Sequence, residues 1–162
     1  MRALLLALAL ALPCGEALAR ESLGVFQGWG AFRDPGVPRC YAIAMAEPTG
    51  RQRDYQPYAS IGTWPKRAMR GQVHFRVSRQ LAPSPAITLS IAGRRFSLEG
   101  GGGDAWAIDQ STNAAIIAAM RSAQWMTITA RDSRSRRFSD SWKLAGVATA
   151  MDAATVGCAR GR

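Results

Sequence analysis

Short apolar segments, broken by clusters of glycine and proline, fill the chain between residues 23 and 108. The segments are rich in aromatic and β-branched residues, which is typical of successive strands in an antiparallel sheet. The breaks, such as Asp34-Pro35-Gly36 and Glu47-Pro48, cannot continue a strand ladder because proline has no N–H donor and fixes its own φ. The pattern predicts strands at residues 25–32, 40–46, 58–64, 73–77, 87–91, 94–98 and 104–108.

In the second half of the chain the strand-type pattern of apolar residues gives way to a helical one. Residues 112–122 have the composition of a helix, with Asp109 or Ser111 available as its N-cap. Strands are predicted at residues 125–130 and 138–144, with an arginine-rich turn between them, and a closing helix at residues 146–156. We therefore predict an α+β fold: an antiparallel, β-rich, sandwich-like domain with two helices in its C-terminal half.

The N-terminus has the pattern of a secretory signal peptide. Arg2 precedes an apolar run that ends at Pro13, and the small residues Ala17 and Ala19 fit the recognition positions of a signal peptidase. The run is too short for a membrane-spanning helix, which needs roughly 20 apolar residues. We predict cleavage of residues 1–19 and a mature chain of residues 20–162 that forms one domain and has no transmembrane segment.

Export determines which cysteines remain in the mature chain and whether they are oxidised. Cys14 leaves lipid attachment open as an alternative, although Pro13 stands where a lipoprotein signal has a small residue. After cleavage only Cys40 and Cys158 remain, and an isolated pair in an oxidising compartment is predicted to form a disulfide. Two distant cysteines and a single histidine give no zinc or iron site, so we expect no metal and no cofactor.

The chain is strongly basic, with a formal net charge of +10. This charge favours acidic partners, while a basic surface that serves solubility, or a coding bias towards arginine, remains the alternative. The densest cluster lies in the predicted hairpin turn at residues 131–137. Guanidinium groups there can bind phosphate or carboxylate bidentately. The predicted anion-binding residues are Arg131, Arg134, Arg136 and Arg137.

Residues suited to catalysis are few. His74 is the only histidine, and its position in the predicted strand 73–77 turns it away from the core. Asp104 and Asp109 flank another predicted strand, and no further ligand-type residues support them. The chain also has no Gly-x-Ser-x-Gly motif that would expose a nucleophilic serine. We therefore predict a non-enzymatic protein without catalytic residues. The alternative is a hydrolase that acts on an envelope polymer and uses these three residues.

Five tryptophans offer large apolar surfaces. Trp64 precedes Pro65-Lys66-Arg67 at a strand end, which favours an exposed anchor beside positive charge. The other four occupy apolar strand contexts and are predicted to fill the core. These four are Trp29, Trp106, Trp125 and Trp142.

The chain contains a series of short motifs: Phe26-Gln27-Gly28-Trp29, Cys40-Tyr41-Ala42-Ile43, Trp106-Ala107-Ile108-Asp109, Ile116-Ile117-Ala118-Ala119-Met120-Arg121, Met126-Thr127-Ile128, Ser133, Asp140, Leu144-Ala145-Gly146, Ala150 and Cys158. Their order and spacing, taken together, resemble the invasion-associated locus B family of exported bacterial proteins. Trp142 and Val147 depart from the family pattern, which usually has tyrosine and an aromatic residue there. The resemblance covers most of the mature chain and implies a periplasmic or envelope protein, linked in some pathogens to entry into host cells. It implies no catalytic residue or ligand.

Together these observations predict a non-enzymatic protein of the Gram-negative periplasm, surface-associated or secreted as an alternative. Its basic hairpin loop is expected to contact an anionic envelope or host-surface partner: a lipid headgroup, an acidic polysaccharide or another envelope protein. Export makes a nucleic-acid partner implausible, so none is expected.

Overall fold

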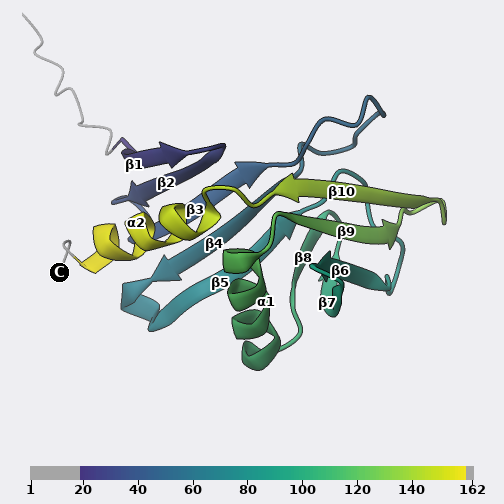
Figure 1. Ribbon diagram of the computed structural model, residues 1–162. Helices are drawn as coiled ribbons and strands as arrows, with labels where there is room; N and C mark the ends of the chain where they lie inside the picture. The colour runs from purple at the N-terminus through teal and green to yellow at the C-terminus, as the bar shows by residue number, and fades with distance from the viewer. Residues whose placement is uncertain (1–18, 160–162) are drawn as a thin grey trace, which may run out of the picture.

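The computed structural model describes residues 19–159, which form one ten-stranded antiparallel sheet and two α-helices (Figure 1). Residues 1–18 of the predicted signal peptide, and with them the lipid-attachment alternative at Cys14, lie outside the described residues. The strands follow the order β1-β2-β3-β4-β5-β8-β7-β6-β9-β10 across the sheet. Their bounds are β1 Glu21–Phe26, β2 Trp29–Asp34, β3 Arg39–Met45, β4 Tyr58–Trp64, β5 Met69–Arg76, β6 Ile87–Ile91, β7 Arg94–Gly101, β8 Asp104–Ala107, β9 Trp125–Arg131 and β10 Arg137–Lys143.

The sheet folds over on itself, so that its last strand, β10, lies against β2 and β5. The Trp142 ring of β10 packs 5.7 Å, centroid to centroid, from the Phe75 ring of β5. Trp29 of β2 donates a 2.9 Å hydrogen bond from its indole N–H to the Lys143 carbonyl. These contacts join distant strands across a buried apolar layer. The predicted α+β, sandwich-like fold is therefore confirmed.

Two helices cover the edges of this layer. Helix α1, Gln110–Ser122, begins where the Asp109 side chain accepts the Thr112 N–H at 2.6 Å, which satisfies one of the free donors of the first turn. Helix α2, Val147–Ala159, packs on β1, β2 and β3 (Figure 1). Both helices lie in the C-terminal half, as predicted. A short 3-10 helix, Pro65–Arg67, joins β4 to β5.

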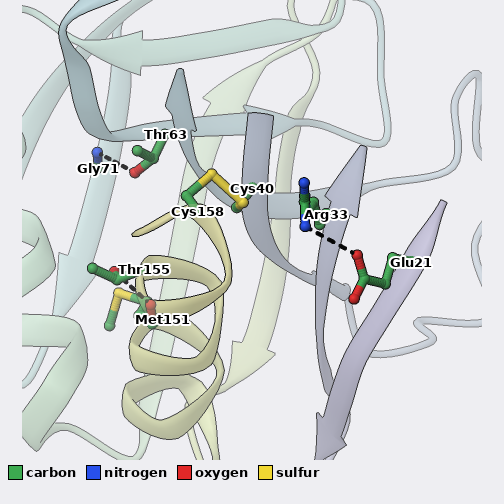
Figure 2. The surroundings of a disulfide bond; sticks show 8 residues. All are labelled: Glu21, Arg33, Cys40, Thr63, Gly71, Met151, Thr155 and Cys158. Atoms are coloured by element: carbon green, nitrogen blue, oxygen red, sulfur yellow. Dashed lines mark hydrogen bonds and ion pairs between the residues drawn. A yellow bond between two sulfur atoms is a disulfide. The ribbon is translucent and has the colours of Figure 1, made fainter. Parts of the chain in front are cut away.

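The disulfide between Cys40 and Cys158 fixes α2 to the sheet (Figure 2). Cys40 lies in β3 and Cys158 in the last turn of α2, with 5.7 Å between their Cα atoms and 118 residues between them in sequence. The pairing predicted from the sequence is confirmed. No helix among residues 19–159 is both long and apolar enough to cross a membrane.

The prediction of one strand over residues 25–32 is wrong. The chain reverses at Gln27 and Gly28, which have φ angles of 49° and 98°, and pairs β1 with β2 as a hairpin. Positive φ at both central residues is the mark of the two-residue turn that matches strand twist, and glycine favours it. The apolar pattern runs through this turn without interruption, because Phe26 and Trp29 flank it directly.

The predicted burial is confirmed for two of the five tryptophans and is wrong for the others. Trp29 and Trp142 are fully buried, as expected. Trp125 is 47% exposed, because its neighbour Met126 points into the core and successive side chains of a strand face opposite sides. Trp106 is only half buried. Trp64 is half buried as well, where we expected an exposed anchor.

Candidate anion-binding site

Three segments meet beyond the C-terminal end of β5 and enclose a hollow of about 270 Å³. They are the β3–β4 connection at residues 46–57, the segment after β5 at residues 77–86, and the β9–β10 turn together with the start of β10, residues 132–139. Six arginines and only one acidic residue, Asp132, line the hollow. We call this feature the arginine hollow. Its arginines are Arg51, Arg53, Arg79, Arg134, Arg136 and Arg137.

Asp132 organises the β9–β10 turn from within. Its Oδ1 atom accepts the backbone N–H groups of Arg134 and Arg136, both at 2.9 Å. Its Oδ2 atom accepts the Nε–H of Arg136 at 3.0 Å. Asp132 is only 3% exposed, so these bonds replace its contacts with water. The turn thus has a fixed shape, with the guanidinium groups arranged around a buried acceptor.

Arg79 connects the three segments. Its guanidinium donates to the Gln52 carbonyl at 2.9 Å and forms ion pairs with Asp132 at 3.4 Å and Asp54 at 3.5 Å. The side chain is 16% exposed. The backbone N–H of Ser133 also donates to the Gln80 carbonyl at 2.8 Å. Arg79 is therefore a structural cross-link as well as part of the lining.

Four arginines of the hollow form no ion pair with any carboxylate among residues 19–159: Arg51, Arg53, Arg134 and Arg137. Arg53 is held by one hydrogen bond, from its Nη2 to the Glu47 carbonyl at 2.8 Å. A bound anion would give these groups the charged partner that the protein does not supply. Guanidinium forks match the oxygens of phosphate and carboxylate, so the hollow is suited to bind either group.

A fully buried carboxylate lies beneath the hollow. Asp140 of β10 accepts the backbone N–H of Ser78, which lines the hollow, at 2.8 Å through Oδ2. Its Oδ1 has no hydrogen-bond partner among the described residues. Burial raises the pKa of Asp140, although the Ser78 hydrogen bond and the charge of Arg53 act in the opposite direction. Asp140 thus anchors the floor of the hollow from below.

The arrangement around Asp132 predicts a specific acid response. Burial alone would raise the pKa of Asp132, but the hydrogen bonds from Arg136 and Arg134 outweigh it and lower the pKa from 3.8 to about 2. The unfolded chain therefore takes up this proton first as the pH falls. The stability contributed by ionised Asp132 is complete above about pH 5, begins to fall near the unfolded pKa of 3.8, and is lost as the pH falls through about 2.

We expect the Asp132→Asn variant to unfold at lower urea concentration than the wild type at pH 7. The difference between their midpoints should shrink steadily from pH 5 to pH 2.5, because the wild type loses the same charge. Urea unfolding at several pH values measures this. A difference that stays constant over that range would show that the Asp132 charge does not hold the turn.

Only part of the predicted basic cluster lines the hollow. Arg134, Arg136 and Arg137 do, whereas Arg131 donates from its guanidinium to the Ser135 carbonyl at 2.7 Å and braces the turn. Arg51, Arg53 and Arg79 were not predicted from the sequence. In the sequence, Arg51 and Arg53 are visible only as two arginines in a connection flanked by proline and glycine, and Arg79 only as an arginine just after a predicted strand. The local sequence around each of these arginines does not show that the three segments meet in the fold.

The structure brings together two of the three residues considered for catalysis, His74 and Asp104, but not Asp109. His74 Nε2 lies 3.0 Å from Asp104 Oδ1, and Arg76 donates to the other Asp104 oxygen at 2.6 Å. Asp109 is occupied as the N-cap of α1. His74 has no hydrogen bond to a serine, threonine or cysteine side chain within the described part of the chain. No cluster of three or more metal-ligating His, Cys, Asp or Glu side chains occurs in residues 19–159.

No family model, no curated protein and no solved structure matches the chain. The case for a function therefore depends on the geometry described above and on the sequence patterns.

Proposed function

We propose that the arginine hollow binds an anionic group of an envelope or host-surface partner, and that the protein acts by this binding and not by catalysis. The observation that carries the proposal is the convergence of six arginines from three chain segments against a single carboxylate. Four of them have no charged partner among the described residues. Keeping so many like charges together is unfavourable unless a counter-charge binds between them.

The segments around the hollow are pre-organised for this role. Asp132 holds the backbone of the β9–β10 turn, and Arg79 fixes that turn to the β3–β4 connection. Binding therefore does not have to pay for ordering a loose loop. The lining also includes Thr49, Ser78 and Ser139, whose hydroxyl groups can donate further hydrogen bonds to an anion.

Binding to vesicles tests the proposal. The mature protein should sediment with phosphatidylglycerol vesicles, but not with phosphatidylcholine vesicles, and the binding should weaken steeply with added salt. Replacing Arg134, Arg136 and Arg137 by Ser should remove it. Parallel titrations with an acidic polysaccharide and with the vesicles would tell which source of anions the hollow prefers.

The matched control removes the same charge elsewhere. Arg67, Arg94 and Arg95 lie outside the hollow, so replacing these three by Ser lowers the net charge equally. We expect this control to retain most of the vesicle binding. Unchanged binding in the hollow variant, or equal losses in both variants, would rule out a localised site.

We further propose that the protein is exported to the periplasm and is of the invasion-associated locus B type. The signal-peptide pattern and the family motifs support this, and so does the disulfide, because such bonds persist in oxidising compartments. Mass spectrometry of a periplasmic extract should find a chain that begins at Arg20 with both remaining cysteines oxidised. A full-length chain recovered from the cytosol would contradict the export proposal.

A hydrolase is the second candidate, because His74 and Asp104 form a hydrogen-bonded pair. That pair could orient a histidine as a general base. Release of soluble fragments from envelope polymers by the mature protein, abolished by His74→Gln, would support this candidate over the binding proposal.

A further inference from the structure

A second cavity lies at the other end of β5, between α1, α2 and the β4–β5 connection. Its volume is about 600 Å³, which is within the range of small-molecule sites in proteins. Gly71, near the start of β5, lines this cavity, whereas Ser78, just beyond the end of β5, lines the arginine hollow. The two sites are therefore separate, and neither shares a lining residue with the other.

The interior of this cavity is apolar. Ile61 of β4, Ile117 of α1, and Met151 and Ala154 of α2 contribute side chains without polar hydrogen-bonding groups. Cys158, which forms the disulfide with Cys40 (Figure 2), is also in the lining. A ligand that fills this space would bury apolar surface on all of these groups.

The hydroxyl groups in the lining already bond to the main chain. Thr155 donates to the Met151 carbonyl at 2.8 Å, and Thr63 accepts the Gly71 N–H at 3.1 Å (Figure 2). The charged groups of the lining are two arginines, and it contains no acidic residue. Arg70 is exposed and the Arg121 side chain is 42% exposed, so both lie at the mouth.

The two arginines differ in their availability. Arg121 forms an ion pair with Asp152 at 2.7 Å, which joins α1 to α2. Arg70 forms no ion pair within residues 19–159. An apolar interior with a free guanidinium at its mouth matches a molecule that has an apolar chain and an anionic head.

We propose that this cavity binds a single acyl chain with an acidic head group, the chemistry of a fatty acid or a lysophospholipid. The chain occupies the space between Ile61, Ile117 and Met151, and the head group pairs with Arg70. This site is independent of the anion-binding function proposed for the arginine hollow. Each can fail without the other.

Calorimetric titration with straight-chain carboxylates, each below its micelle concentration, tests the chemistry. From octanoate to dodecanoate the affinity should rise about fourfold per added methylene, the factor expected for burying each CH₂. Dodecyltrimethylammonium, which has the same chain and a cationic head, should bind much more weakly. A lysophospholipid of equal chain length then shows which of the two head groups fits better.

Three variants of the mature protein locate the site. Ile117→Trp should obstruct the space between Ile61 and Met151 and weaken dodecanoate binding at least about tenfold, and Arg70→Gln should weaken it about threefold to tenfold. Arg94→Gln, at the exposed first residue of β7, is the charge-matched control and should bind as the wild type does. The variant with Arg134, Arg136 and Arg137 replaced by Ser should also retain dodecanoate binding, which separates this site from the hollow.

Thermal unfolding checks whether the Ile117→Trp variant is folded. If this variant does not fold, the Arg70→Gln variant and the chain-length series test the proposed acyl-chain site without it. Affinity that does not depend on chain length, equal affinity for the cationic amphiphile, or an unchanged affinity in Arg70→Gln would each overturn the proposal.

Discussion

Loss of the Cys40–Cys158 disulfide is expected to lower the free energy of unfolding by about 4 to 5 kcal/mol. The bond closes a loop that spans 118 residues, and in the chain-entropy model a loop of this length gives about that contribution by restricting the unfolded chain. Single domains are stable by only about 5 to 15 kcal/mol. The reduced protein should therefore be close to its limit of stability.

Urea unfolding of the oxidised wild type, the reduced wild type and the Cys40→Ala/Cys158→Ala variant measures this effect. The reduced wild type is the cleanest comparison, because it keeps both sulfur atoms and breaks only the bond between them. Each single alanine variant should be destabilised about as much as the double variant, since either change breaks the same bond. Equal urea midpoints for oxidised and reduced protein would contradict the stabilising role of the disulfide.

Gly146→Ala is expected to destabilise the domain by about 2 to 5 kcal/mol. Gly146 has a φ angle of 87°, a conformation that costs an L-residue roughly 1–2 kcal/mol. A Cβ at this position would also collide with the backbone carbonyl oxygen of Phe26. Backbone cannot move aside as a side chain can, so overpacking adds about 1–3 kcal/mol.

The matched control is Gly93→Ala. Gly93 has a similar φ angle of 78°, but a Cβ there would meet no heavy atom within 4 Å. This variant should lose only the backbone contribution, roughly 1–2 kcal/mol. The difference between the two variants in chemical denaturation measures the contact with Phe26. Equal losses would show that this close approach does not constrain the start of α2.

These contacts give a physical reason for a short sequence motif. Leu144-Ala145-Gly146 precedes α2 directly. Leu144 is buried, and Gly146 lets the chain turn where β1 comes closest. The motif therefore places α2 against β1 to β3, and α2 in turn delivers Cys158 to Cys40.

Local patterns predicted most of the elements, because they depend on side-chain alternation and on breaks in the ladder. Phe138, Asp140 and Trp142 alternate with exposed or half-buried polar residues, and β10 is where that alternation placed it. The first strand pair was missed because Phe26 and Trp29 make the apolar pattern continuous across the turn at Gly28.

The candidate site was only partly predictable for a different reason. The β9–β10 turn is dense in arginine over a few residues, so its charge is visible in the sequence. Arg51, Arg53 and Arg79 join it only because the sheet folds over and brings β3, β5 and β10 close together. Such long-range proximity depends on topology, which residue spacing does not encode.

The distinction between a basic turn and a three-segment hollow can be measured directly. Arg51→Ser/Arg53→Ser removes two charges from the β3–β4 connection, and Arg94→Ser/Arg95→Ser removes two from the start of β7, outside the hollow. In titrations with phosphatidylglycerol vesicles at several salt concentrations, the first variant should bind several-fold more weakly and show a shallower salt dependence, while the second should match the wild type. Identical binding curves for the two variants would contradict the hollow as the anion-binding site.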